Sequence, residues 1–251
     1  MLRTIQVDFR RLILCRRYYY SIAGMTLALL LNGITYTKTI AGHATLGECF
    51  SEVSFGGFML LFYMLCVVGG GLDYCMDVKH HYMRYMVIRS DLTTYALSKT
   101  AISAIAGYIS MLIGQVFFLG MMALYLLWDR WGAGETMSVA GDASEMWWTI
   151  LTFSLLGALL SVLGLFVTSL VPNIFVGIAS PVLLYYMAIT LTNKHWTNPA
   201  ILPACIYFPN DYALFGGGIR QFGYALLVTL CLLMLLYIGI HRRMKRRGEN
   251  V

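Results

Sequence analysis

The sequence predicts an all-α polytopic membrane protein with six transmembrane helices. Hydrophobic residues make up 59% of the 251 residues and charged residues only 12%, which leaves too little polar surface for a soluble protein of this length. About 20 apolar residues cross a bilayer. Six apolar runs of roughly that size occupy most of the chain, so we expect 1–251 to form a single transmembrane domain. The runs are 20–37, 55–72, 100–127, 146–171, 174–191 and 222–240.

The distribution of basic residues predicts the orientation of these spans. Of the 18 Lys and Arg residues, 14 lie in the N-terminal segment, in the connection between the second and third runs, or in the C-terminal tail. Short cytoplasmic loops retain Lys and Arg, so we expect both termini to be cytoplasmic. The net charge of +6 then reflects topology and attraction to anionic lipid headgroups, and does not indicate a nucleic-acid partner.

Segment 1–19 is predicted to be an interfacial helix on the membrane surface. Its apolar residues recur at helical spacing, and basic residues between them are available to headgroups. A cleavable signal peptide is not expected, because no short apolar core followed by small residues is present. A flexible basic leader is the alternative. The apolar positions are Leu2, Ile5, Phe9, Leu12 and Ile13.

The connection between the second and third spans is the only substantial polar segment on the basic side. Tyr82, Tyr85 and Arg89 fall at spacings of three and four, which predicts a short surface helix within 74–91, and Asp91 can cap the helix that follows. Asp77 is positioned to pair with His80, His81 or Arg84. We expect a cytoplasmic partner to dock here. The candidate docking residues are Asp77, Tyr82, Arg84, Tyr85, Arg89 and Asp91.

The outer connection 193–221 mixes Pro199, Pro203, Pro209 and the run 216–218 of glycines with many aromatic residues. It is too apolar for water and too broken to span as one helix. We predict a re-entrant segment in the outer membrane face, with an aromatic interfacial belt as the alternative.

Few polar residues interrupt the spans. Asn32 and Gln115 are the main exceptions, and each is more readily explained as an interhelical hydrogen-bonding group than as a substrate ligand. Pro181 should kink the fifth span. Together these three are candidate positions on a substrate path. The scarcity of ionisable groups argues against an ion-coupled carrier and against an enzyme embedded in the membrane.

Small residues in the third and fourth runs recur at the spacing of closely packed helices. This favours contacts inside the bundle over a seam between subunits. The positions are Ser103, Gly107 and Gly114 in the third run, and Gly157, Ser161 and Gly164 in the fourth.

Motifs for chemistry are absent from the sequence. No Lys follows a Gly, so there is no Walker A phosphate loop, and neither HExxH nor GxSxG occurs. The six cysteines form no CxxC pair, and no metal site is predicted. Asp73 and Asp77 alone do not make an acid–base catalyst. Cys49 and Cys205 both fall on the predicted outer side, where a disulfide is possible but not required.

The order of these elements resembles the permeases of type-2 ATP-binding-cassette exporters. The resemblance covers the whole chain, from the N-terminal interfacial helix to the broken segment before span six. The usual Glu of that family is Asp77 here, and its common Gly-Thr pair and turn Pro are replaced in the region of His80, His81 and Ser90. The residues that carry the resemblance are Asp77, the run 84–89, Ser90, Asp91, Tyr95, Ser98 and Lys99.

The resemblance implies a half-transporter in a bacterial plasma membrane. Two such chains, identical or similar, would form the membrane core, and separate cytoplasmic ATPase subunits would bind ATP and magnesium, so this chain needs no cofactor and is not itself an enzyme. The 74–91 helix would be the coupling helix. The first, second and fifth helices would line a route for an amphipathic or hydrophobic substrate, such as a peptide, drug or lipid-like molecule, moving outward. A non-transporting sensor or immunity subunit is the main alternative, and a membrane-embedded enzyme a lesser one.

Overall fold

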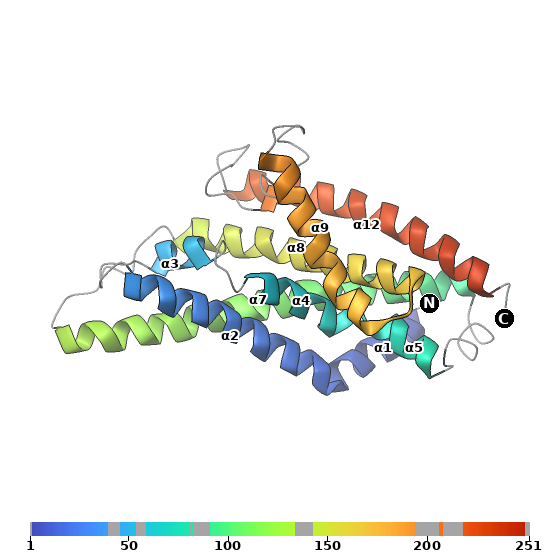
Figure 1. The fold of residues 1–251 in the computed structure, drawn as a ribbon, viewed down its shortest axis with the longest axis horizontal. Helices are drawn as coiled ribbons and strands as arrows, with labels where there is room; N and C mark the ends of the chain where they lie inside the picture. Colours follow the sequence, from blue (N-terminus) through green and yellow to red (C-terminus); the bar gives the residue numbers. More distant parts are fainter. Residues whose placement is uncertain are drawn as a thin grey trace.

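The computed structural model describes residues 2–39, 46–53, 59–80, 82, 91–133, 143–193, 206–207 and 218–248, and the regular structure in these ranges is entirely α-helical. The helices form an elongated bundle with both chain termini at the same end of its long axis (Figure 1). They are α1 (Leu2–Leu14), α2 (Arg16–Thr39), α3 (Leu46–Val53), α4 (Met59–Gly70), α5 (Asp73–Lys79), α7 (Leu92–Ala133), α8 (Ala143–Leu170), α9 (Ile174–Asn193) and α12 (Gly218–Gly248).

Three of the described helices are long and apolar enough to span a membrane: Leu92–Trp128, Met146–Leu170 and Gly218–Arg246. Counting the bent pair α4 and α5 as one span makes four. The prediction of an all-helical membrane protein is therefore confirmed at this level. The predicted first span, 20–37, lies within α2, whose 24 residues include several Tyr and Thr residues and Asn32, and the predicted fifth span lies within α9. The full set of six spans stays a prediction.

The second predicted span, 55–72, ends at a bend. Helix α4 stops at Gly70, and α5 starts at Asp73 in a direction 50° away. Glycines 69–71 occupy this corner, and glycine lowers helix stability because its backbone loses the most entropy on folding. α5 thus covers the beginning of the predicted coupling helix, whereas residues 83–90 lie outside the described residues.

Helix α8 is the centre of the bundle. In its most apolar window 78% of residues are buried, compared with 44% for α7 and 17% for α12. Its neighbours are α7, α12, α4 and α9, while α2 packs on α4 and α7. Large side chains from several helices fill the interior, including the stacked rings of Phe62 and Phe153 at 6.0 Å between centroids.

Helices α7 and α8 approach so closely because glycine faces glycine where they cross. A Cβ atom at Gly157 would lie 2.7 Å from the carbonyl oxygen of Gly107, and one at Gly107 would collide with the backbone of Gly157. The hydroxyl oxygens of Ser103 and Ser161 are 2.9 Å apart at the same contact. The small-residue stripes predicted from sequence are therefore contacts within this chain.

Helices α8 and α9 are joined by the three residues 171–173. The backbone N–H of Phe175 donates to Asn173 Oδ1 at 3.0 Å, so Asn173 caps the start of α9. Pro181 lies buried inside α9, in a helix that continues to Asn193.

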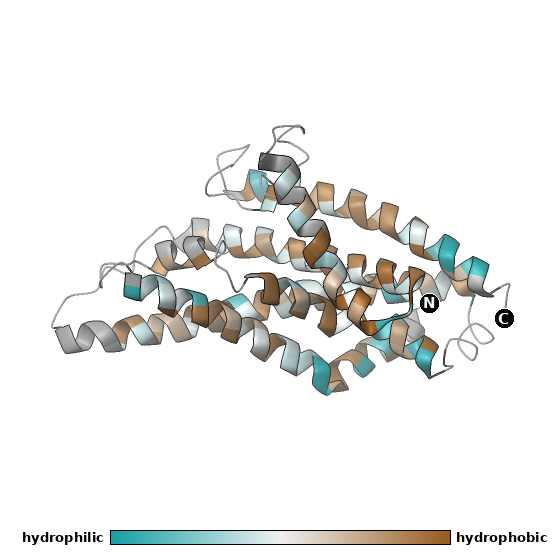
Figure 2. Ribbon diagram, in the orientation of Figure 1, coloured by the Kyte–Doolittle hydropathy of each residue, from teal (hydrophilic) through white to brown (hydrophobic). Residues whose placement is uncertain are grey.

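The outer faces of the long helices are apolar. Phe117 and Leu124 on α7, Phe175 on α9 and Met234 on α12 are all exposed. Figure 2 shows hydrophobic residues along the helices and hydrophilic residues gathered where α1, α5 and the end of α12 lie. A soluble monomer rarely exposes so much apolar surface, whereas lipid requires it.

Most of the predicted re-entrant segment, 193–221, lies outside the described residues. Ile206 and Tyr207 are described, and both are buried against α12. Tyr207 Oη lies 2.7 Å from Thr229 Oγ1, and Gln221 Nε2 donates to the carbonyl oxygen of Ile206 at 2.9 Å. This part of the outer connection is therefore bound to the helix that follows. Cys49 is buried in α3, and Cys205 lies outside the described residues, so a disulfide between them stays a prediction.

Substituting Gly107 by Leu should destabilise the protein, because the side chain must push α7 away from the backbone of Gly157. Overpacking of this kind costs about 1–3 kcal/mol. The effect is measured as the midpoint temperature of unfolding in detergent, at which half of the monodisperse peak on size-exclusion chromatography is lost. Gly120→Leu is the matched control on the same helix, since a Cβ there meets nothing within 4 Å. Equal melting of the two variants would contradict the close crossing.

Candidate functional site

A group of buried and half-buried charged side chains lies where α1, α5 and the start of α7 meet, at the end of the bundle that holds both termini (Figure 1). We call this group the charge cluster. Three acids and three bases compose it, and they come from the four helices α1, α2, α5 and α7. Its members are Asp8, Arg11, Arg17, Asp73, Asp77 and Lys99.

Lys99 is the central cation of the charge cluster. Its Nζ lies 2.8 Å from Asp77 Oδ2 and 3.6 Å from Asp8 Oδ1, and its side chain is only 5% exposed. The carboxylates are as deeply buried, at 7% exposure for Asp77 and 3% for Asp8. Charges taken so far out of water are tolerated only when they are paired and hydrogen-bonded.

Two neighbours on α7 each donate a hydrogen bond to one of these acids. The Tyr95 hydroxyl donates to Asp77 Oδ2 at 2.9 Å, and the Ser98 hydroxyl lies 3.2 Å from Asp8 Oδ2. Tyr95 and Lys99 are four residues apart, so the helix presents both on one face toward α5. α7 thereby holds α5 through Asp77 and α1 through Asp8.

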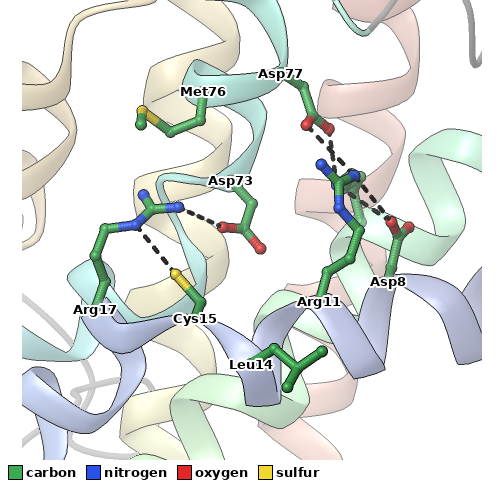
Figure 3. Close-up of a pocket in the computed structure, with 9 residues that line it drawn as sticks. Asp8, Arg11, Leu14, Cys15, Arg17, Asp73, Met76 and Asp77 are labelled. Atoms are coloured by element: carbon green, nitrogen blue, oxygen red, sulfur yellow. Dashed lines mark hydrogen bonds and ion pairs between the residues drawn. The ribbon is translucent and has the colours of Figure 1, made fainter. Parts of the chain in front are cut away.

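The two arginines contact the charge cluster from its more exposed side. Figure 3 shows Arg11 directed toward Asp77 and Arg17 directed toward Asp73. The distances are long, 3.9 Å from Arg11 to Asp77 and 3.7 Å from Arg17 to Asp73, and Arg11 is 48% exposed. Arg17 Nε also donates to Cys15 Sγ at 3.3 Å, and the Arg11 guanidinium lies 4.5 Å from the centre of the Tyr82 ring. Water weakens such partly exposed ion pairs.

The charge cluster borders a cavity of about 340 Å³. The Asp8 Oδ1 atom is buried and accepts no hydrogen bond from any described residue. Asp73 lies past the bend that ends α4, where burial raises the pKa of its carboxyl group while Lys99 and Arg17 act in the opposite direction. Besides the charge cluster, the lining includes Leu14, Cys15 and Met76.

The arrangement connects helices, because each buried acid, Asp8 on α1 and Asp77 on α5, lies close to the same cation, Lys99 on α7. The described residues include no group of three His, Cys, Asp or Glu side chains that could hold a metal ion. What the geometry does supply is a stiff link, because moving α5 away from α7 separates Lys99 from Asp77.

The residues expected from sequence to form the docking segment fall in different places. Asp77 belongs to the charge cluster, where it forms ion pairs with Lys99 and Arg11 from other helices. Of the partners that the spacing suggested for it, His81 and Arg84 lie outside the described residues. Tyr82 is half-buried under Arg11, and Asp91 is exposed immediately before α7. Arg84, Tyr85 and Arg89 lie outside the described residues.

The candidate substrate-path residues lie on three helices: Asn32 on α2, Gln115 on α7 and Pro181 on α9, all buried. None of them lines the cavity beside the charge cluster. The side-chain amide of Gln115 makes no hydrogen bond to a described residue, so the interhelical bond expected for it is not seen there.

Sequence reasoning missed Asp8 and Arg11 and did not join Lys99 to Asp77. A signal for Asp8 was present, since it is the only acid before Glu48 and lies four residues before Leu12, on the face of α1 predicted to be apolar. An acid on a buried face requires a cation nearby. The sequence does not say that this cation is Lys99, because the contact joins distant helices.

Replacing Lys99 by Met should destabilise the protein strongly, because Asp8 and Asp77 then remain buried and the half-exposed Arg11 is the one described cation left to pair with both of them. Breaking a buried ion pair by removing one partner costs about 3–5 kcal/mol. The midpoint of thermal unfolding in detergent reports the loss. Lys79→Met, at an exposed position of α5, is the control and should melt like the parent protein. A Lys99→Met protein that melts like the control would show that the charge cluster does not hold these helices together.

Comparison of the chain with models of protein families, with curated proteins and with solved structures gives no match.

Proposed function

We propose that this chain is the transmembrane permease subunit of an ATP-driven exporter of the type-2 ATP-binding-cassette class. The observation that carries the proposal is the link between the beginning of the predicted coupling helix and the membrane helices. Asp77, in α5, is bound through buried contacts to Lys99 and Tyr95 near the start of the longest helix. A segment that receives force from a partner needs a connection of this kind.

The proposed topology has six spans with both termini in the cytoplasm. Support comes from helices α2, α4, α7, α8, α9 and α12, which contain most of the predicted spans, and from the common end at which α1 begins and α12 finishes (Figure 1). The excess of basic residues at that end favours the cytoplasmic side of a bacterial plasma membrane.

The proposed mechanism begins at a separate ATPase subunit that binds ATP and magnesium. Its closure pushes on 74–91. Because α5 is attached to α7 and α1 by the charge cluster, the displacement is shared by these helices instead of bending α5 alone. The corner at glycines 69–71 is the natural point about which α5 and α4 change their angle.

A second permease chain, identical or similar, would complete the route for the substrate. We place Asn32, Gln115 and Pro181 on this route. The amide of Gln115 is buried among apolar residues without a hydrogen bond to a described residue, and such a group stabilises a polar atom that enters beside it. An amphipathic or hydrophobic cargo, such as a peptide, drug or lipid-like molecule, fits walls that are largely apolar.

Charge reversal at Arg84 or Arg89 should reduce association with the ATPase by about tenfold or more, because an acid replaces a base at the proposed contact. The measurement is Mg²⁺-dependent ATP hydrolysis that copurifies with the tagged chain from its native membranes. Arg243→Glu, on the exposed tail of α12, is the control for overall charge.

Normal ATP hydrolysis in both variants would place the docking site elsewhere. If the unsubstituted protein is functional but never copurifies with ATPase activity, the proposal that it belongs to an ATP-driven exporter is refuted. ATPase copurification without movement of any substrate would favour the sensor or immunity subunit.

Reporter fusions should test the proposed topology. A fluorescent protein fused after Val251 should fluoresce, because it stays in the cytoplasm, and alkaline phosphatase fused after Ala140, between the predicted third and fourth spans, should be active outside it. Exchanging the two reporters is the control and should silence both. Activity of the phosphatase at the C-terminus would contradict the six-span arrangement.

A further inference from the structure

We propose that the cavity beside the charge cluster binds the headgroup of a zwitterionic phospholipid that carries a primary ammonium group, of the phosphoethanolamine type. The proposal does not depend on the transport function. It rests on the chemistry of the cavity wall and on the place of the cavity at the end of the bundle, beside the amphipathic helix α1 (Figure 3).

The acidic part of the wall offers unused hydrogen-bond acceptors. Asp8 is 3% exposed, yet its Oδ1 atom receives no hydrogen bond from a described residue. Among the described residues the nearest cationic atoms, Lys99 Nζ at 3.6 Å and Arg11 at 4.0 Å, are too far for one. Asp73 adds a second carboxylate to the same cavity. A primary ammonium group has three N–H donors to give, whereas a trimethylammonium group has none.

The basic part of the wall offers unused donors. Arg11 and Arg17 both line the cavity, and their closest carboxylate contacts are 3.7–4.0 Å long. Of the N–H groups of Arg17, the Nε–H is engaged with Cys15. The planar guanidinium group matches two oxygens of a phosphate, and such bonds are stronger when both partners are charged.

The balance of charge selects a zwitterion over a simple ion. Three acids and three bases surround the cavity, so a lone anion meets the carboxylates and a lone cation meets the guanidinium groups. A phosphate and an ammonium group in one molecule pair with both kinds of side chain at once. The volume of about 340 Å³ lies within the range of small-ligand sites.

The setting of the cavity favours a lipid over a free small molecule. Leu14, at the end of α1, lines the cavity and is 81% exposed, and the adjacent Ile13 is exposed as well. In Figure 3 Leu14 lies on the side of α1 away from the acids. A lipid can place its charged head among the arginines and acids while its chains cover these leucine and isoleucine side chains, as amphipathic helices do at the bilayer interface.

The test is native mass spectrometry of the purified full chain in detergent with an equimolar mixture of phosphatidylethanolamine, phosphatidylcholine and phosphatidylglycerol of identical acyl chains. We expect phosphatidylethanolamine to be retained about tenfold more than either competitor. The ammonium group of phosphatidylcholine has no N–H donors, and phosphatidylglycerol has no ammonium group. Equal retention of the three lipids overturns the proposal.

Substitutions of residues that line the cavity test whether the retained phosphatidylethanolamine binds there. Arg17→Gln should lower retention of phosphatidylethanolamine and phosphatidylcholine alike, because both carry the phosphate. Asp73→Asn should lower the preference between them, because it removes a partner of the ammonium group. Arg10→Gln, exposed on α1 but outside the cavity lining, is the matched control and should change nothing. If neither Arg17→Gln nor Asp73→Asn differs from Arg10→Gln, the lipid binds elsewhere.

A competition experiment separates the lipid from its free headgroup. Glycerophosphoethanolamine, which has no acyl chains, should displace the lipid only at concentrations at least about 100-fold higher, because it leaves the apolar surface of α1 uncovered. Displacement at equal concentration overturns the assignment to a lipid and points to a soluble zwitterion. The comparison among lipids on the parent protein stands even if a variant fails to fold.

Discussion

The buried contact of Lys99 with Asp77 and Asp8 is the constraint on which the cytoplasmic end of the proposed topology depends. A lysine at 5% exposure requires compensating charge, and the compensation comes from two different helices. The three elements therefore have one mutual position in which Lys99 lies beside both carboxylates. Apolar packing alone allows helices to slide or rotate at modest cost, whereas a misplaced buried charge is expensive. The ion pairs thus specify an arrangement that the surrounding Leu, Tyr and Ala side chains then fill.

Among the described residues, the middle of the bundle is held together by close packing of helices and not by ion pairs. Glycine and serine let α7 and α8 approach until backbone meets backbone, and no charge takes part. Within a bilayer, where burying an apolar side chain gains little, close van der Waals contact is the available source of attraction. The molecule therefore combines a central region held by shape with one end held by charge. Such an arrangement permits a movement of α1 and α5 at the charged end while the crossing of α7 and α8 stays intact.

The sequence predicted those features that depend on local composition. Long apolar runs indicate membrane helices, a stripe of small residues indicates a close crossing, and the adjoining runs 146–171 and 174–191 leave room only for a short connection. The charge cluster was harder to predict from the sequence. Asp77, Tyr95, Ser98 and Lys99 could each be selected as unusual, but which acid meets which base depends on the packing of helices separated by many residues. Helical spacing suggested partners for Asp77 within its own segment, whereas the described ion-pair partners come from α7 and α1, because those helices cover its buried face. The bend at Gly71 was also missed, since three glycines in a row can be read either as part of an apolar run or as its end.

The bond between Ser98 and Asp8 spans 90 residues of sequence, and this separation has a consequence for biosynthesis. Chains emerge from the ribosome with the N-terminus first. Asp8 is therefore synthesised long before Lys99 and Ser98 exist, and until then its carboxylate has to remain in water or among headgroups. α1 accordingly reaches its final position only after the start of α7 has been made and inserted. The contact that secures α1 therefore forms only after α2, α4 and α5 have been synthesised, although α1 itself is made before all of them.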